Sequence, residues 1–386
     1  MIIMEEMKMK DRTRQDIRKI DDELRTLFGR RVALTQEMTK KLPAGEAAVT
    51  GRQYEREFMN GISAGEDPSM ESLERVFFRN VFDLSKSYAD TAVRNDSHLK
   101  DDIEKALAST PKEFPVSAVV ACQGVEGAYS QLAADKLFKA ADIMYFRTFD
   151  GVFQAVESGL CRYGVLPIEN SSYGSVTGVY DLMHSHKFHI VRTMKYQINH
   201  RLMAKPGVKF SEIKEIYSHE QALGQCSRFL KDNKDIKVTV VANTAVAAMT
   251  VADSDRRDVA AISSPDCSKL YGLEVIRDDV QNSDHNYTRF ICISKDLEIY
   301  PGASKASIMM AIDHKPGSLS NTLSSFSALG LNLTKIESRP ISGRDFEFMF
   351  YLDVEASVYS EPFISLLTRL DNEGNGFTFL GSYSEV

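Results

Sequence analysis

The chain has 386 residues and a formal net charge of −7, a length that predicts two or three domains rather than one core. An acidic chain lacks the basic surface that nucleic acid requires, so no nucleic-acid partner is expected. No apolar run approaches the roughly 20 residues of a membrane span, and the start does not read as a signal peptide, which predicts cytoplasmic residence without membrane contact. Five cysteines without a C-x-x-C pair predict reduced thiols and no metal.

Residues 11–94 carry a purely helical pattern. Apolar residues recur at spacings of three and four along one seam, and these are Ile17, Ile20, Leu24, Leu27, Leu34 and Met38. Such spacing predicts one long amphipathic helix, with shorter helices expected at residues 53–62 and 69–93. Because one long helix with two partners forms only a small core, we expect this segment to dimerise.

Arg31 interrupts the seam, and a charge at such a position needs a partner or an anionic ligand. The opening D-x-x-R-x-x-I-x-x-I-D-D-E-L and the run R-R-V-A-L resemble AroQ-type chorismate mutases, all-helical dimers often fused ahead of prephenate dehydratases. The resemblance implies functional positions at Arg14, Arg31, Glu55 and Ser85. It departs where that family carries lysine, aspartate, arginine and glutamine, because this chain has Leu42, Gly51, Tyr54 and Ala89.

The lysine and the glutamine of that family bind the ether oxygen of chorismate. Losing two such donors forfeits about 2.7 to 4 kcal/mol each, by analogy with an oxyanion-hole donor. Lys41 is one residue from Leu42, but a slip of one residue turns a side chain by about 100° on a helix. The sequence therefore predicts a degenerate mutase domain at residues 1–100, kept for dimerisation or regulation.

Residues 101–115 are expected to link this domain to the next, because the stretch is polar and ends in Pro111 and Pro115, which disfavour helix on either side. Residues 116–298 then alternate short β-branched runs with helical patterns, an order that is typical of a parallel α/β sheet. The pair Gly124 and Gly127 could let the backbone approach a ligand, although G-x-x-G without a third glycine is no dinucleotide fingerprint.

Three strands of this segment end in a hydroxyl residue that precedes a helical pattern: Ser218, Thr244, and Ser263 or Ser264. Each could be only a helix N-cap. Three together, at the carboxyl ends of strands, favour an anion-binding cleft, since helix N-termini attract anions there. A ligand with two carboxylates would suit such a cleft.

The same segment contains four motifs in order: Y-G-V-L-P-I-E-N-S-S-Y-G-S-V, S-H-E-Q-A-L-G-Q-C, N-T-A-V-A-A and N-Y-T-R-F. In order and spacing they resemble prephenate dehydratases over residues 116–296. The resemblance implies two α/β lobes like those of type II periplasmic binding proteins, with the active site between them. The second lobe is expected at about residues 191–276, with residues 288–294 returning to the first lobe.

The resemblance further implies that Thr288 is essential for removing water and carbon dioxide from prephenate. Aromatisation drives that elimination, so no cofactor or metal is expected, only a held substrate and a proton donor. A threonine hydroxyl is a poor acid, which favours hydrogen bonding or proton relay by Thr288. Arg289 could pair with Glu169 or with a substrate carboxylate, whereas His219 beside a cap is more often structural.

The remaining candidates are polar or adjacent to these motifs. Further catalytic candidates are Phe290, Asn170 and Ser171, and the substrate-binding candidates are Ser218, Gln221, Gln225, Thr244, Gly174 and Asn286.

The tail, residues 304–386, reads strand, helix, strand, strand, helix, strand, which is the ferredoxin-like order βαββαβ. The runs D-H-K-P-G-S-L and N-L-T-K-I-E-S-R-P resemble an ACT domain and imply phenylalanine as effector, with a dimerisation sheet as the alternative. Ser318 and Ser320 depart from the family's usual alanine and valine. The effector-binding candidates are Gly317, Ser318, Leu319, Asn332, Leu333, Glu337, Ser338, Arg339 and Pro340.

The sequence thus predicts an all-α domain, a two-lobed α/β catalytic domain and an α+β ACT domain. The expected activity is the decarboxylating dehydration of prephenate to phenylpyruvate in phenylalanine biosynthesis, regulated by phenylalanine. The alternatives are a fully bifunctional chorismate mutase/prephenate dehydratase and a non-catalytic small-molecule sensor. Prephenate and arogenate both remain as substrates, and homodimer and homotetramer both remain as assemblies.

Overall fold

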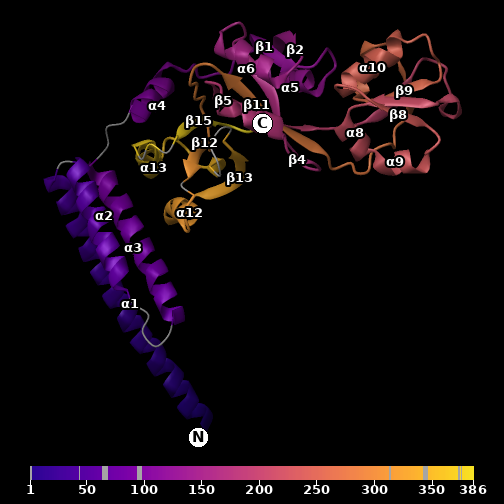
Figure 1. The fold of residues 1–386 in the computed structure, drawn as a ribbon. Helices are drawn as coiled ribbons and strands as arrows, with labels where there is room; N and C mark the ends of the chain where they lie inside the picture. The colour runs from indigo at the N-terminus through magenta and orange to yellow at the C-terminus, as the bar shows by residue number, and fades with distance from the viewer. Residues whose placement is uncertain are drawn as a thin grey trace. The chain divides into compact units, whose positions relative to one another are not determined.

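The structure is a computed structural model whose residues form two compact units (Figure 1). The first unit comprises Met1–Asp101, Ala311–Leu333 and Tyr359–Phe377, and the second comprises Asp102–Met310, Thr334–Val358 and Thr378–Val386. The described residues are 2–42, 44–62, 68–93, 98–312, 314–341, 347–372, 374 and 376–386.

Three helices open the first unit: α1 (Ile2–Lys41), α2 (Ala44–Gly61) and α3 (Pro68–Val93). Aromatic rings pack between α2 and α3, where Phe58 lies 4.7 Å from Phe78 and 5.5 Å from Phe82 between ring centroids. The expected helix at residues 53–62 begins earlier, because residues 44–52 are rich in alanine and polar residues that form helix without an apolar period.

The apolar seam of α1 is largely exposed in the single chain. Exposure runs from 44 % at Leu24 to 63 % at Leu34, with Ile17, Ile20 and Leu27 between these values. The described residues of the chain do not cover these leucine and isoleucine side chains enough to bury them. Met38, the last residue of the seam, is half-buried.

The second unit contains two α/β lobes (Figure 1). The first lobe has the sheet order β2-β1-β3-β11-β5, with the short β4 paired to β3. Its strands are β1 (Ser117–Gln123), β2 (Ala140–Phe146), β3 (Tyr163–Asn170), β4 (Gly174–Ser175), β5 (His189–Gln197) and β11 (Tyr287–Ser294). Its helices are α5 (Tyr129–Leu137), α6 (Phe149–Glu157) and α7 (Thr177–Met183).

The expectation of a parallel sheet is only partly correct in this lobe. Strands β1, β2 and β3 are parallel, but β11 runs antiparallel to both β3 and β5. The sheet is therefore mixed, because β11 enters from the second lobe rather than through a helical crossover. At the centre of the sheet a Cβ on Gly164 would lie 2.8 Å from Val152, so glycine lets α6 pack closely.

The second lobe has the sheet order β10-β6-β9-β7-β8. Its strands are β6 (Arg201–Ala204), β7 (Glu215–Ser218), β8 (Lys237–Val240), β9 (Val259–Ser263) and β10 (Glu274–Arg277). Its helices are η1 (Phe210–Glu212), α8 (Glu220–Gln225), α9 (Ser227–Asp232), α10 (Thr244–Asp253) and α11 (Pro265–Leu270). The expected start of this lobe near residue 191 is too early, because β5 still belongs to the first sheet.

The structure also differs from the expected linker. Helix α4 (His98–Ser109) occupies most of that stretch, with Ile103 and Ala106 buried. Its apolar residues are spaced by three and four among many charges, so the polar composition concealed an amphipathic helix. The helix ends before Pro111, as the backbone of a residue preceding proline disfavours the helical conformation.

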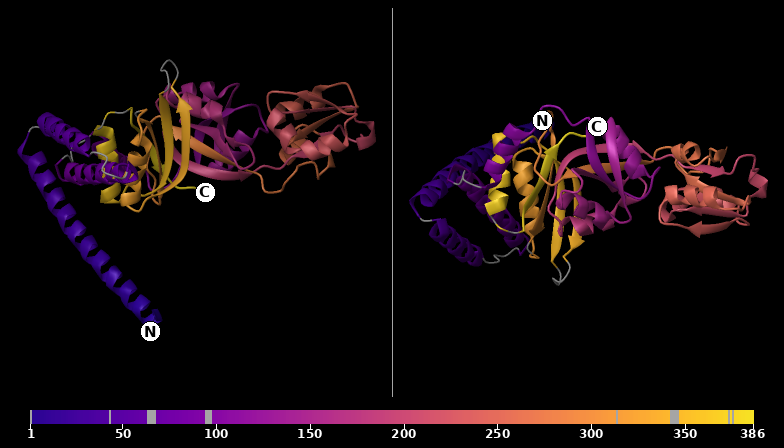
Figure 2. Two further views of the ribbon diagram at one scale, coloured as in Figure 1. Left: turned by 60° about the horizontal axis from the view of Figure 1, so that its bottom comes forward. Right: turned by 90° about the horizontal axis from the view of Figure 1, so that it is seen from above.

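The tail has the expected order of elements: β12 (Lys305–Ile312), α12 (Ser318–Ala328), β13 (Asn332–Pro340), β14 (Phe348–Glu355), α13 (Glu361–Asn372) and β15 (Thr378–Tyr383). Its strands form one sheet (Figure 2). Their order in that sheet is β13-β14-β12-β15. This is the ferredoxin-like arrangement. Asp313, the first residue of the run D-H-K-P-G-S-L, lies outside the described residues.

Candidate active site

A cavity of about 440 Å³ lies where the two lobes meet. The first lobe contributes the ends of β1, β3 and β11 and the start of α5, and the second lobe contributes residues around α8 and α10. Polar lining residues from the two lobes are Gln123, Tyr129, Ser130, Asn170, Ser175, Thr177, Thr288, His200, His219, Gln221, Gln225, Asn243 and Thr244. A concave site with converging polar groups between two lobes is the usual form of a small-molecule site.

Strand alternation decides which motif residues face this cavity. Strand β11 pairs with β3 so that Thr288 lies opposite Asn170 and Arg289 lies opposite Glu169, and a bulge follows Arg289. Thr288, Phe290 and Asn170 line the cavity. Because successive side chains alternate between the faces of a sheet, Arg289 and Glu169 point to the opposite face.

The amide of Asn170 is oriented by its own turn. Its Oδ1 accepts hydrogen bonds from the backbone N–H groups of Ser172 (2.9 Å) and Tyr173 (3.1 Å). This arrangement leaves Nδ2 to donate to Thr288 Oγ1 (2.9 Å) and to Asn286 Oδ1 (2.8 Å). Since the Thr288 oxygen accepts from Asn170, its own proton is available for donation into the cavity.

The second lobe extends this hydrogen-bond chain. Gln225 Nε2 donates to Asn170 Oδ1 at 3.3 Å, so its Oε1 faces His200 Nε2 at 2.7 Å. His200 must therefore carry its proton on Nε2 and donate it to Gln225. Burial lowers the pKa of His200 to about 4, which keeps the ring neutral near pH 7. No sequence motif marked His200, because its role depends only on a contact between distant residues.

The cavity is lined by neutral groups. None of the described residues that line it is lysine or arginine, so substrate carboxylates would rely on hydroxyls, amides and backbone N–H groups. The start of α10 contributes to this lining through Asn243 and Thr244. Positive helix N-termini favour anions in such a position.

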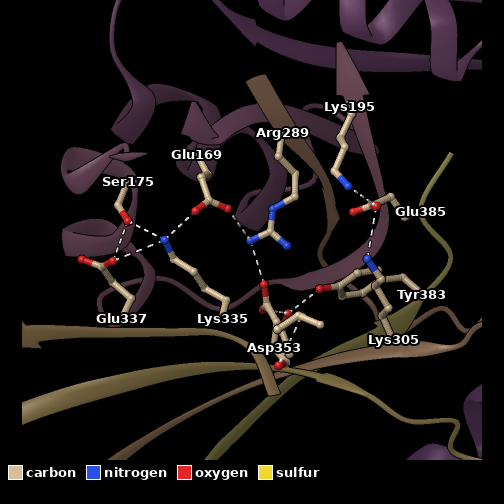
Figure 3. Close-up of polar contacts among 12 residues, drawn as sticks. Glu169, Ser175, Lys195, Arg289, Lys305, Lys335, Glu337, Asp353, Tyr383 and Glu385 are labelled. Carbon is tan, nitrogen blue, oxygen red and sulfur yellow. Dashed lines mark hydrogen bonds and ion pairs between the residues drawn. The ribbon is translucent and has the colours of Figure 1, made fainter. Parts of the chain in front are cut away.

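Arg289 does not lie in the cavity. Its Nη2 is 2.7 Å from Asp353 Oδ2, without the alignment of a hydrogen bond, and 3.4 Å from Glu169 Oε2 (Figure 3). Pairing with Glu169 was one of the two expected roles. The other, binding a substrate carboxylate, does not fit this orientation, because the guanidinium is buried on the opposite face of β11.

Two of the three helix caps differ from the expected ones, and Ser264 stands at the third as expected. Asn243, rather than Thr244, caps α10 by accepting a hydrogen bond from Val246 N–H at 2.8 Å. His219, rather than Ser218, precedes α8, and its side chain makes no cap bond. Ser264 precedes α11, also without a side-chain cap bond. His219 and Thr244 nevertheless line the cavity.

Four other candidates do not line the cavity. Ser171 Oγ accepts a hydrogen bond from Tyr287 N–H at 3.0 Å, and Ser218 Oγ donates to the carbonyl of Ile262 at 2.7 Å. Gly174 is exposed on the turn with φ of 76°, a conformation that favours glycine. Asn286 is buried and accepts a hydrogen bond from Asn170 Nδ2. Gln221 and Gln225 both line the cavity.

The two glycines after β1 allow the lobes to approach. Gly124 and Gly127 have φ of 113° and 87°. A Cβ on Gly124 would lie 3.2 Å from Asn243 Nδ2, and one on Gly127 would lie 2.8 Å from Cys267 Sγ. The expected close approach to a ligand is, in the structure, a close approach to the second lobe.

In the helical segment three of the four mutase-like residues, Arg31, Ser85 and Glu55, already have hydrogen-bond partners within the chain. Arg31 Nη1 donates to the carbonyl of Val81 at 3.3 Å and its guanidinium lies 4.7 Å from the Phe82 ring centroid. Ser85 Oγ donates to the same carbonyl at 2.6 Å. Glu55 accepts from Lys86 Nζ at 2.6 Å, and Arg14 is exposed. The resemblance to the mutase family did not predict a role for Lys86, the cation that pairs with Glu55.

Within the described ranges, no three His, Cys, Asp or Glu side chains are grouped as metal ligands would be. None of the helices in the described part of the chain is long and apolar enough to cross a membrane. The fold and cavity therefore define a two-lobed α/β protein with a small-molecule site of neutral donors between its lobes.

Comparison with known proteins narrows this class. The family model for prephenate dehydratase matches residues 120–298. The Arabidopsis thaliana protein named arogenate dehydratase/prephenate dehydratase 2 is 38% identical over 276 residues, covering 68% of this chain and 72% of the relative. The Escherichia coli protein named bifunctional chorismate mutase/prephenate dehydratase is 30% identical over 378 residues, covering 96% and 95%.

Among solved structures, prephenate dehydratase in complex with L-Phe from Arthrobacter aurescens matches with a TM-score of 0.63 and 28% identity. The match covers 69% of this chain and 89% of that one. The chain belongs to the prephenate dehydratase family, and it is thus a carbon–oxygen lyase.

Proposed function

We propose that the chain converts prephenate to phenylpyruvate, water and carbon dioxide, as a step of phenylalanine biosynthesis. The observation that carries the proposal is the Asn170–Thr288 pair in the cavity between the lobes, where Asn170 donates to Thr288 at 2.9 Å. The family membership and the names of the relatives support the same reaction.

In this reaction the bond between the ring and its carboxylate breaks, and carbon dioxide leaves. The released electron pair enters the ring, which becomes aromatic as the bond to the ring hydroxyl breaks. The leaving oxygen must gain one proton to become water. Thr288 is positioned to donate a hydrogen bond to that oxygen, and a relayed proton from solvent completes the water, because a threonine hydroxyl is too weak to act as a free acid.

The protein's contribution is orientation and electrostatic stabilisation. Asn170 sets the direction of the Thr288 proton, and Gln225 and His200 brace Asn170 from the second lobe. A preorganised donor aimed at the oxygen where charge develops contributes roughly 2.7 to 4 kcal/mol. Neutral donors hold the two carboxylates without strong ion pairs, so carbon dioxide loss is not opposed by a tightly paired ring carboxylate.

The test is turnover by the purified full-length chain. With prephenate we expect phenylpyruvate formation, and arogenate is assayed in parallel because it differs only at the side-chain keto or amino group. Binding of prephenate without turnover would contradict the proposal and favour the alternative of a non-catalytic sensor.

We propose for residues 1–100 a degenerate chorismate mutase-like domain, followed by a connecting segment at residues 101–115 that includes most of α4 and by the dehydratase domain at residues 116–298. Leu42 and Ala89 at the ether-binding positions and the engagement of Arg31 with Val81 and Phe82 support this. The alternative is a fully bifunctional enzyme, which the likeness to the Escherichia coli protein over 96% of the chain favours. Chorismate turnover by the full chain distinguishes the two.

The exposed seam of α1 supports self-association through this helix, as a homodimer or within a homotetramer. Five buried cysteines without a disulfide support a reducing compartment such as the cytoplasm.

For residues 304–386 we propose an ACT domain that binds phenylalanine. The βαββαβ order, the positive φ of 87° at Gly317 before α12 and the L-Phe complex of the Arthrobacter protein support this. The candidates Ser318, Leu319, Asn332 and Leu333 surround that turn and the start of β13 in sequence. Addition of phenylalanine is expected to change prephenate turnover, and an unchanged rate at saturating phenylalanine would contradict the assignment.

A further inference from the structure

Strand β13 presents a row of charged side chains to the first lobe. Lys335, Glu337 and Arg339 are spaced by two residues, so they share one face of the strand. Arg339 forms two hydrogen bonds to Asp181, at 2.7 and 2.9 Å. Glu337 accepts a hydrogen bond from Ser175 (Figure 3). Two residues expected to bind an effector, Glu337 and Arg339, therefore contact the catalytic lobe.

Lys335 holds both sides of the turn that carries Asn170. Its Nζ donates to Glu169 Oε1 at 2.7 Å and to Ser175 Oγ at 2.8 Å (Figure 3). Glu169 and Ser175 lie opposite each other in the pairing of β3 with β4. The turn between them includes the two backbone N–H groups, at Ser172 and Tyr173, that orient the Asn170 amide.

The neighbouring strand β14 contacts β11, the strand that carries Thr288, through Asp353 and Arg289. Asp353 lies 2.7 Å from Arg289, the residue directly after Thr288. Asp353 is itself fixed by a hydrogen bond from Ser307 Oγ at 2.6 Å, within the same sheet. Ser307, Asp353 and Arg289 are all buried, so solvent does not screen this contact as it screens a surface ion pair.

We propose that Lys335 and Asp353 are positioning residues for the dehydration. Lys335 acts through Glu169, which directly precedes Asn170, and Asp353 acts through Arg289, which directly follows Thr288. Asn170 and Thr288 line the cavity. The inference rests on the proposed function. It also connects the sheet that carries effector candidates with Asn170 and Thr288. A shift of β13 therefore changes the direction of the Thr288 hydroxyl.

The decisive variant is Lys335→Met in the full-length chain. It keeps the aliphatic stem and removes the charge, and we expect kcat for prephenate to fall at least about tenfold while KM changes less than about twofold, because alignment rather than binding is lost. Asp353→Asn is expected to act in the same direction. Lys335→Arg, which retains the charge and the donors, should restore part of the lost kcat.

Lys305→Met is the matched control. Lys305 is 20% exposed, against 16% for Lys335, and it also pairs with a glutamate, Glu385, at 3.1 Å. The Lys305–Glu385 ion pair also lies between the tail and the first lobe, but it does not contact the turn between Glu169 and Ser175 (Figure 3). We therefore expect Lys305→Met to retain the kcat of the unmodified chain.

Two further measurements separate positioning from general damage. If Lys335 acts through Glu169, the double variant Lys335→Met/Glu169→Gln should lose no more kcat than the worse single variant. Amide exchange of the peptide spanning residues 169–175 should be faster in Lys335→Met than in Lys305→Met.

Unmodified kcat in Lys335→Met, or equal losses in Lys335→Met and Lys305→Met, would overturn the inference. If the unmodified chain does not turn over prephenate, the proposed function fails by that result alone. Exchange of residues 169–175 then decides the inference: faster exchange only in Lys335→Met supports it, and equal exchange in both variants overturns it.

Discussion

The two-lobed segment buries its apolar side chains, whereas the helical segment leaves a row of them exposed. In the lobes, strands such as β9 and β11 are buried over nearly their whole length, and five cysteines are buried with them. In the helical segment, the α1 seam is exposed, up to 63% at Leu34. Burial of one such side chain contributes roughly 1.5–3 kcal/mol, so the lobes gain this stabilisation within the single chain whereas the α1 seam does not.

The segments also differ in what remains available for chemistry. In the lobes, Arg289 and Glu169 are paired on the face opposite the cavity, which leaves Thr288, Asn170 and Gln225 as a connected set of neutral donors. In the helical segment, Arg31 already contacts a carbonyl and an aromatic ring. The lobes thus leave connected polar groups facing a cavity, whereas Arg31 and Ser85 of the helical segment both donate to the carbonyl of Val81.

The largest expected effect is that of Thr288→Ala, which removes the donor of the lobe site. We expect kcat for prephenate to fall by about 10²- to 10³-fold, the usual loss for one donor to a developing charge. Phenylpyruvate formation measures the loss, and thermal unfolding checks that folding is intact. Thr288→Ser keeps the hydroxyl and should retain much of the activity. Near-normal turnover by Thr288→Ala would remove Thr288 from the mechanism.

A smaller effect is expected from His200, which braces the site from the second lobe. His200→Leu removes the donor to Gln225, and we expect kcat to fall roughly tenfold, about the loss of one hydrogen bond to a positioning group. His200→Gln offers an amide donor instead and should retain more activity. Equal kcat in both variants would show that the donor is not needed.

The same residue predicts a pH dependence of stability. Burial lowers the pKa of His200 to about 4 in the folded chain, from its usual value of 6.5, so between these values the unfolded chain binds more protons. The stability from neutral His200 is therefore present above about pH 6.5 and is lost as pH falls through about 4. Chemical denaturation across this range should give a flatter profile for His200→Gln, and identical profiles would contradict the assignment.

The exposed seam of α1 predicts a change of assembly with little change of catalysis. A charge in the seam, as in Leu27→Asp, should lower the molar mass measured by light scattering, because two such faces no longer pack in water. Prephenate turnover per chain should stay within about twofold, since the lobes hold a complete core and site. Leu160→Asp is the control, because Leu160 is 56% exposed against 58% for Leu27. An unchanged mass in Leu27→Asp would place the interface elsewhere.

The smallest effect is expected at Arg31. Arg31→Ala should leave prephenate turnover unchanged, and both it and the unmodified chain should convert chorismate weakly or not at all. Prephenate production from chorismate, followed by its conversion to phenylpyruvate, measures both rates. Robust chorismate turnover that is lost in Arg31→Ala would end the contrast between the two segments and establish a bifunctional enzyme.

Several features could be predicted because they depend on local pattern. The order of elements in the tail follows from periods of two and 3.6 in its apolar residues. Asn170 and Thr288 belong to motifs whose order and residue identities resemble one family. Helix α4 was missed, although its apolar spacing is helical, because charges dominate its composition. The caps at Asn243 and His219 were each placed one residue away, since neighbouring polar residues compete for the same cap.

The sequence by itself determined the family, the main elements and the pair of strands that carry the candidate residues Asn170 and Thr288. Only the tertiary structure decided which side chains of those strands face the cavity, since a bulge after Arg289 and the pairing of β11 with β3 set the register. It also decided the contacts of His200, Lys335 and Asp353. The physical reason is that strand register and contacts between residues far apart in the chain arise from packing, which no local period or motif encodes.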